Sequence, residues 1–273
     1  MELRSPCIAT KLLAAANTQR EHFGARANYL IVLVLQLLQA ATRVRAKHTP
    51  IATLVDVFKE FKAQLKAELN DLASKKLLDV RNKKDVYNLL LSSVAAKLFK
   101  QFFYESYHGR MYCYSRWVVV ELCGATTIFL DMCECGLLNV VQVYGLMCKD
   151  SRVMAGAGAS DFVLYKELRE FAWRAQSDHR EALLKFSDSL LVVPAILAEN
   201  NGFDVTSTIK KWHDDDNMMR MGINISTGAH SSIRIWDLYT SRESAVTSAL
   251  DFVLSWLESM AAKELKSYIY GGL

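Results

Sequence analysis

A short run of small residues at 155–158 has the composition of a turn that can hold a phosphate. It contains Gly156 and Gly158 and comes shortly before Asp161, which can cap the start of a helix. Backbone N–H groups at a helix start attract anions because they have no partners within the helix. An ordinary tight turn accounts for the same residues, and on composition alone we favour that simpler interpretation.

Two further clusters contain residue types that bind metals or act in catalysis. Cys133 and Cys135 have two more cysteines and His108 upstream, but the paired C-x₂-C spacing of structural zinc sites is absent. We therefore expect buried free thiols and no metal. Residues 213–216, a histidine followed by three aspartates, are typical of a solvated loop after a helix, and we assign no catalytic role to them.

The overall composition predicts a packed, mainly helical protein. The 273 residues are 51% hydrophobic, which suffices for one large domain or two small ones, and 12 Gly and 3 Pro leave most segments free to form helices. The net charge of +4 is spread among acids and bases, which indicates solvated helix faces and no nucleic-acid partner. Six cysteines without a secretory signal indicate a reducing compartment. We expect the cytoplasm, with a mitochondrial or other organellar assembly as the alternative.

Hydrophobic spacing predicts helices and a few short strands. The apolar run 29–41 is shorter than the about 20 residues that a membrane span needs, so we expect a buried helix and no transmembrane segment. Within it, Leu35→Asp should cost several kcal/mol by burying an unpaired charge. Pro194 should interrupt the helix that contains it. We predict helices at 8–22, 29–46, 51–70, 83–103, 161–175, 180–199, 204–211 and 241–260, and strands at 117–120, 126–130 and within 222–238.

Several segments resemble motifs of the group II chaperonins. Segment 185–202, with V-P-A-I-L-A-E-N-N-G, is similar to a long motif of that family, and 150–161 is similar to its glycine-rich D-x-R-V-V-x-G-G-G-A-x-E stretch. Gly222-Ile-Asn-Ile resembles the element that lines the adenine side of the family's nucleotide site. Gly24-Ala-Arg-Ala-Asn28 stands at the place of its phosphate loop. Asn28 and the segment 235–239 resemble the theta-type subunit.

The resemblance covers 8–103 and 140–260 and implies a fold and a domain organisation. The expected fold is mainly α, a chaperonin equatorial-domain-like helical bundle with a few short β-strands, centred on the 29–41 and 180–199 helices. The expected domains are an N-terminal half (1–103), a shortened intermediate-domain remnant that replaces the apical insertion (104–150), and a C-terminal half (151–273). Residues 104–139 are too few for an independent apical domain of ordinary size, so we expect a shortened family member.

The chain departs from the family in the residues that serve hydrolysis. Ala25 stands at the place of the aspartate that holds magnesium, Arg26 replaces a glycine, and 141–147 lacks the carboxylate that orients water. The resemblance therefore implies a protein that is not an enzyme and has no ATPase activity. We expect no cofactor, with bound ATP as the alternative. The remnant of the nucleotide site comprises Gly24, Ala25, Arg26, Asn28, Gly156, Gly158, Gly222 and Asn224.

These expectations together predict a non-catalytic structural or interaction subunit with protein partners in a hetero-complex. The alternatives are an accessory chaperonin subunit in ATP-dependent protein folding, and a nucleotide-binding protein without hydrolysis. Segment 251–266 keeps apolar residues at helical spacing where the family has a closing strand, so we expect a helix whose Trp256 faces its own core or a partner. The chain should therefore be a monomer or a fixed part of a hetero-complex, outside a complete chaperonin ring.

Overall fold

The computed structural model describes residues 6–47, 49–95, 110–113, 118–121, 126–213, 221–223, 230–232 and 235–270. The described chain is mainly helical with short strands, which confirms the predicted fold class. Its helices are α1 (Pro6–Phe23), α2 (Ala27–Arg45), α3 (Ile51–Ser74), α4 (Lys83–Ala95), α6 (Thr127–Lys149), α7 (Ala159–Arg174), α8 (Ser177–Asp188), α9 (Val192–Glu199), α10 (Val205–His213) and α11 (Tyr239–Tyr270).

The described strands form three small antiparallel sheets of two strands each. The strands are β1 (Arg110–Cys113), β2 (Val118–Glu121), β3 (Val153–Ala155), β4 (Met221–Ile223), β5 (His230–Ser232) and β6 (Trp236–Leu238), and they pair as β1–β2, β3–β6 and β4–β5. The β3–β6 pair joins the start of the α7 segment to the start of α11. Strands β4, β5 and β6 confirm the prediction for 222–238, and β2 agrees with the strand predicted at 117–120, of which residue 117 lies outside the described residues.

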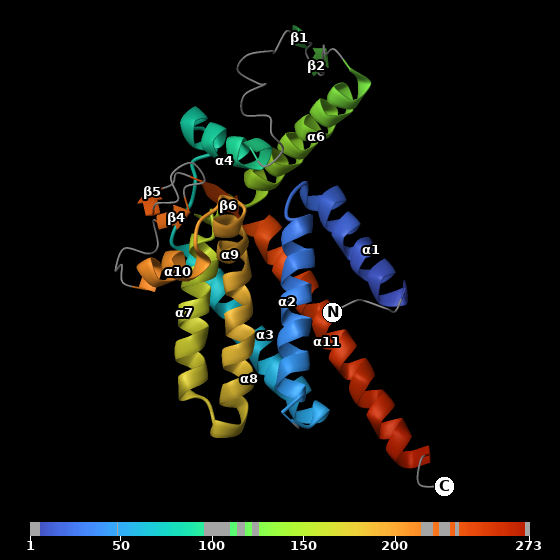
Figure 1. Cartoon of the computed structure of the whole chain (residues 1–273). Coiled ribbons are helices and arrows are strands. Elements are labelled where there is room, and N and C mark those ends of the chain that lie inside the picture. Colours follow the sequence, from blue (N-terminus) through green and yellow to red (C-terminus); the bar gives the residue numbers. More distant parts are fainter. Residues whose placement is uncertain are drawn as a thin grey trace.

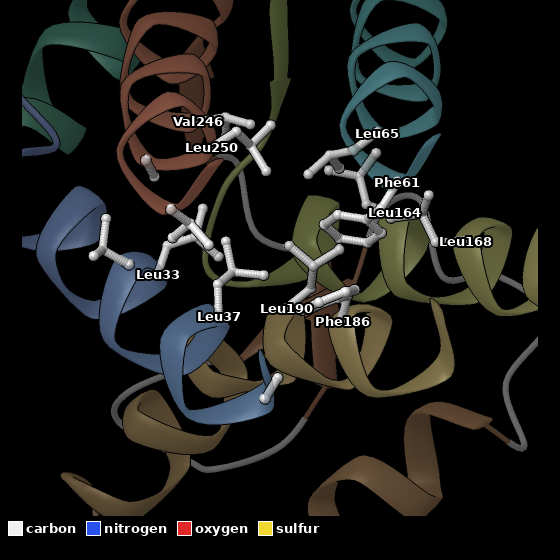
Figure 2. Close-up of a cluster of buried hydrophobic side chains, with 14 of the residues drawn as sticks. Leu33, Leu37, Phe61, Leu65, Leu164, Leu168, Phe186, Leu190, Val246 and Leu250 are labelled. Carbon is white, nitrogen blue, oxygen red and sulfur yellow. The ribbon is translucent and has the colours of Figure 1, made fainter. Parts of the chain in front are cut away.

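The central bundle consists of α2, α3, α7, α8 and α11 (Figure 1). Their apolar faces meet in one core, in which the ring of Phe186 lies 5.0 Å from that of Phe58 and 5.5 Å from that of Phe61, centroid to centroid. Figure 2 shows residues of this core from all five helices and from the 3₁₀ turn Ser189–Leu191 after α8, each at most 1% exposed: Leu33, Leu37, Phe61, Leu65, Leu164, Leu168, Phe186, Leu190, Val246 and Leu250. The helices predicted at 29–41 and 180–199 do lie in the centre.

One face of α2 points away from this core. Leu33 and Leu37 are buried, whereas Leu35, which lies between them on the other side of the helix, is 40% exposed. The prediction that Leu35→Asp buries a charge is therefore wrong. A nearly continuous apolar run does not reveal which of its side chains face inward, because that depends on the neighbouring helices.

The segment predicted as one helix at 180–199 is interrupted, as expected, but upstream of the proline. A 3₁₀ turn at Ser189–Leu191 separates α8 from α9. Pro194 is the third residue of α9, where its missing N–H leaves no intrahelical hydrogen bond unmade. Past α9, Asp204 caps α10 as predicted, since its Oδ2 accepts a hydrogen bond from the N–H of Ser207 at 2.7 Å.

The strand predicted at 126–130 is wrong, because this segment begins α6. The side-chain oxygen of Thr126 accepts a hydrogen bond from the N–H of Phe129 at 3.2 Å and caps the helix. The cap and the helical spacing of the apolar residues that follow favour a helix. They outweigh the strand preference of the β-branched and aromatic residues at 126–130. Helix α4 is described as far as Ala95, and the rest of the predicted helix 83–103 lies outside the described residues. The helix predicted at 251–266 is confirmed within α11, and its Trp256 packs against the core.

Helices α4 and α6 lie together at one end of the bundle (Figure 1). By length and composition alone, two of the helices in the described part of the chain, α2 and α6, could each cross a membrane. The apolar window of α2 is half buried in the core, which explains its composition, whereas that of α6 is only 22% buried. The absence of a transmembrane segment stays a prediction.

Candidate functional site

The first glycine turn, residues 24–26, connects α1 to α2 and touches α6. Gly24 has a φ of +65°, and a Cβ there would lie 2.8 Å from Oε1 of Gln142 and 3.1 Å from the backbone oxygen of Asn139. Only glycine therefore fits at this position. Arg26 also has a left-handed backbone, with a φ of 74°, at the N-cap of α2. Such a conformation costs a residue with a side chain about 1–2 kcal/mol, which contacts of that side chain must offset.

The second glycine turn, residues 156–158, connects β3 to α7. A Cβ on Gly156 would lie 2.8 Å from Cγ2 of Ile235 and 3.2 Å from Oδ1 of Asp237. Ala157 and Gly158 have φ angles of 54° and 81°. Gly158 is the N-cap of α7, with no side-chain hydrogen bond to the helix start. The prediction that Asp161 is the cap is therefore wrong, because this aspartate lies inside the first turn of α7 and binds other residues.

The side chain of Arg26 connects the two turns. Its Nη2 forms an ion pair with Oδ1 of Asp237, the same residue that lies against Gly156. Oδ2 of Asp237 is 3.3 Å from Nη1 of Arg242, and Nη2 of Arg242 forms an ion pair with Oδ1 of Asp161. The hydroxyl of Tyr29 donates to Oδ1 of Asp161 at 3.1 Å. We call these five residues the polar cluster: Arg26, Tyr29, Asp161, Asp237 and Arg242.

The polar cluster balances two guanidinium groups with two carboxylates. Asp161 and Arg242 are each 1% exposed and Asp237 is 6% exposed, whereas the side chain of Arg26 is 24% exposed. Arg26 is therefore the member that a molecule arriving from solvent meets first. The ring of Tyr29 lies 4.3 Å from the guanidinium carbon of Arg242 and 5.9 Å from that of Arg26, which adds cation–π attraction.

Burial and neighbouring charges shift the pKa values of the cluster in different directions. Burial, with the positive charge of Arg242, lowers the pKa of Arg26 to about 10, so this side chain still carries its charge near neutral pH. Burial also acts to lower the pKa of Arg242, but the charge and hydrogen bond of Asp161, together with the interactions of Tyr29, outweigh burial and raise this pKa. Burial also raises the pKa of Tyr29, whose hydroxyl stays a hydrogen-bond donor.

This geometry suits a phosphate group better than a metal ion. The Arg26 guanidinium has the planar fork of donors that binds phosphate, and the start of α7 beside the second turn offers backbone N–H groups. The first turn contains no carboxylate because Ala25 stands in it, and no group of three His, Cys, Asp or Glu side chains among the described residues could hold a metal. Magnesium therefore has no evident ligand set here, and we assign it no role.

The structure brings most of the predicted site residues together. Gly24, Ala25 and Arg26 form the first turn, and Gly156 and Gly158 belong to the second. Gly222 lies in β4, whose Ile223 donates its N–H to the backbone oxygen of Ala157 at 3.1 Å, beside the second turn. Asn28 lies in the first turn of α2 with its side chain exposed. Asn224 lies outside the described residues.

The sequence interpretation did not assign Asp237 and Arg242 to the site. A signal for both was present in their spacing. Arg242 precedes Ala245, Val246 and Ala249 on the buried face of α11, and a charge on such a face requires a buried partner. Asp237 lies between the apolar residues Trp236 and Leu238 of a short strand. The pairing itself could not be inferred, because Asp161 is 81 residues away along the chain from Arg242.

Comparison with known proteins gives consistent matches. The sequence model of the TCP-1/cpn60 chaperonin family matches residues 112–259. T-complex protein 1 subunit theta of Arabidopsis thaliana is 30% identical over 138 residues, which are 48% of this chain and 25% of that protein. Thermosome subunit beta of Halobacterium salinarum is 31% identical over 138 residues, again 48% and 25%. T-complex protein 1 subunit theta of Caenorhabditis elegans is 28% identical over 133 residues, 47% and 24%.

The chain thus covers about a quarter of the length of these relatives. The matches confirm the predicted resemblance to group II chaperonins and to their theta-type subunits. They also overturn one expectation. The expectation that the chain is not an enzyme rested on Ala25, Arg26 and the stretch 141–147, but the matched subunits belong to a family of ATPases, which points to ATPase activity. Departures at single positions were not sufficient evidence against it.

Proposed function

Because the chain belongs to the TCP-1/cpn60 chaperonin family, we propose that it is a chaperonin-type subunit that binds ATP where the two glycine turns meet and works with protein partners. The observation that supports the proposal most is the ion pair of Arg26 with Asp237, which joins the turns and holds a half-buried guanidinium group at their junction. ATP turnover, to which the family points, is part of the proposal. The proposal also includes a cytoplasmic location and a division of the chain into domains at 1–103, 104–150 and 151–273.

Arg26 has the chemistry to exchange a carboxylate for a phosphate. Both bind guanidinium through parallel N–H···O hydrogen bonds, and a phosphate carries more negative charge than one carboxylate. If a phosphate displaced Asp237 from Arg26, the Asp237 carboxylate would still have a partner. Its Oδ2 lies 3.3 Å from Nη1 of Arg242. No buried charge of the polar cluster would therefore lose its last partner when Arg26 exchanges Asp237 for a phosphate.

A role as an interaction subunit that holds other chains in place is a second candidate function. The observation in its favour is that several large apolar side chains of α6 are exposed, among them Ile128 at 73% and Val141 at 67%. A helix that continues through 251–266, where the family has a closing strand, supports an assembly other than a complete ring. Co-purification from native cells, followed by identification of the bound chains, distinguishes this assembly from a ring.

The binding proposal is tested by calorimetry with ATP and by phosphate release on the purified chain. We expect saturable ATP binding, and Arg26→Ala should weaken it about 10- to 100-fold, because a charge-assisted hydrogen bond contributes about 1.5–3 kcal/mol. Arg26→Lys should retain part of the affinity. A matched control is Arg174→Ala, which removes an arginine that is 77% exposed and pairs with Glu170 in the same helix.

Three outcomes would contradict the proposal. If ATP does not bind the folded wild-type chain, the proposal is wrong. Tighter binding by Arg26→Ala would mean that this side chain blocks the junction. Equal losses with Arg26→Ala and Arg174→Ala would mean that affinity depends on overall charge. Melting temperatures of all variants separate a loss of binding from a loss of folding.

A further inference from the structure

The place where the two glycine turns meet contains a cation that belongs to the protein itself. The guanidinium of Arg26 lies on the solvent side of the polar cluster and pairs there with Asp237. The side chain of Arg26 is 24% exposed, whereas that of Arg242, the other arginine of the cluster, is 1% exposed. A phosphate that arrives from solvent therefore meets a guanidinium whose carboxylate partner it can replace.

Two helix starts converge on this guanidinium. Arg26 is the N-cap of α2 and Gly158 is the N-cap of α7, and neither helix start has a side-chain cap. The first turns of the two helices are joined directly, because the hydroxyl of Tyr29 donates to Oδ1 of Asp161 at 3.1 Å. The N–H groups of a helix start attract anions. The junction thus combines one guanidinium with two sets of backbone donors.

The carboxylates of the junction are already engaged with arginines. Oδ1 of Asp237 pairs with Arg26, and its Oδ2 lies 3.3 Å from Nη1 of Arg242. Oδ1 of Asp161 pairs with Arg242, and its Oδ2 is buried. Magnesium requires oxygen ligands in nearly octahedral geometry, and proteins usually hold it with one or two carboxylates together with the phosphates of a substrate. Neither aspartate is available for that role, and Ala25 supplies no ligand from the first turn.

Magnesium and Arg26 would compete for the same phosphate oxygens. The ion bridges oxygens of neighbouring phosphates and neutralises negative charge that would otherwise attract the guanidinium. It would also lie near two guanidinium groups, which repel it. On the basis of the proposed ATP site, we propose that the junction binds nucleotide phosphates free of magnesium, with the guanidinium of Arg26 in the place of the metal ion.

The two departures from the chaperonin motif in the first turn fit this exchange. Ala25 removes the carboxylate at the place of the magnesium-binding aspartate, and Arg26 adds a positive charge at the next position. The φ of 74° at Arg26 suits the glycine that the motif has there, so the arginine is present against the preference of the backbone. An arginine also stabilises the charge on a phosphoryl group during its transfer, so the lack of a carboxylate in this turn does not exclude turnover.

Calorimetry with ATP on the purified full chain, once in EDTA and once in excess magnesium chloride, tests the proposal. We expect ATP to bind in EDTA at least as tightly as it binds with magnesium. Arg26→Ala should weaken binding in EDTA about 10- to 100-fold through the loss of a charge-assisted hydrogen bond, and magnesium should not restore the affinity. The control Arg174→Ala, on an exposed arginine of α7, should match the wild-type chain in both buffers.

Two variants of the first turn isolate the effect of the missing carboxylate. Arg26→Gly suits the backbone at this position and should bind ATP weakly in both buffers. Ala25→Asp combined with Arg26→Gly restores both residues of the chaperonin motif. This double variant should bind ATP about tenfold more tightly with magnesium than in EDTA, because its carboxylate can hold the ion. Melting temperatures verify that both variants are folded.

The outcomes separate this inference from the ATP site on which it rests. Wild-type binding that is about tenfold or more tighter with magnesium than in EDTA would overturn the inference and leave the proposed ATP site in place. Absence of ATP binding in both buffers would reject the site and the inference together. A double variant that responds to magnesium no more than the wild-type chain would show that positions 25 and 26 do not decide between metal and guanidinium, and would also overturn it.

Discussion

Arg242 shows how a fully buried charge is accommodated at the scale of single residues. Its guanidinium is held between Asp161 of α7 and Asp237 of β6 and lies over the ring of Tyr29 of α2. One of its nitrogens, Nε, and Oδ2 of Asp161 have no hydrogen-bond partner in the described structure. The cluster therefore depends on charge pairing more than on complete hydrogen bonding, and loss of one charge leaves the others uncompensated.

Replacement of Arg242 should destabilise the fold strongly. Arg242→Met removes one partner of a buried pair, and we expect a loss of about 3–5 kcal/mol in the free energy of unfolding. Urea denaturation followed by circular dichroism measures this loss. The control Arg174→Met changes an exposed pair and should shift stability by no more than about 0.5 kcal/mol. Similar losses for both variants would show that the cluster contributes no special stabilisation.

At the scale of elements, α2 shows that a mainly apolar helix can still have one side exposed to solvent. Its core side includes Leu30, Leu33, Val34, Leu37 and Leu38, all at most 1% exposed, and its outer side includes Leu35. The helix satisfies the length and composition criteria for a membrane span, yet half of the window is buried against α11, α8 and α1. Packing against neighbours therefore explains its composition.

Two aspartate substitutions separate the faces of α2. Leu37→Asp should cost about 4 kcal/mol or more, because it places an unpaired charge and a cavity in the core at a position with no exposure. Leu35→Asp should cost about 1 kcal/mol or less, mainly through lower helix propensity. Thermal and urea unfolding of the two variants provide the comparison. Equal costs would mean that Leu35 is covered in solution.

At the scale of the whole molecule, one core joins the two ends of the sequence. Helix α11 packs against α2 and α3, and α8 packs against α2 (Figure 1). The rings of Phe58 and Phe61 from the first half surround that of Phe186 from the second. Neither half retains its apolar contacts without the other, so the two halves should not be independently stable.

Unfolding should therefore be a single cooperative transition. Far-ultraviolet circular dichroism reports helices of both halves, whereas tryptophan fluorescence reports mainly the second half, where Trp173, Trp212, Trp236 and Trp256 lie. The two signals should give the same midpoint in urea. Separate midpoints would show that the halves unfold independently and would contradict a main core shared by both halves.

The sequence by itself determined most of the helices other than α6, the two glycine turns and the family resemblance. Local periodicity and backbone-permissive residues are properties of neighbouring positions, so 51–70, Gly24 and Gly158 could be assigned without a partner. The strand predicted at 126–130 failed because the cap at Thr126 and the apolar period of the following turns decide a helix start together.

Tertiary structure alone decided which side chains meet. The exposure of Leu35, the pairing of Arg26 with Asp237, and the burial of Arg242 between two carboxylates each depend on elements far apart in the chain. The sequence does not reveal which residue a charged side chain will pair with. The free energy that permits burial of the charge comes from groups that only the fold brings within contact distance.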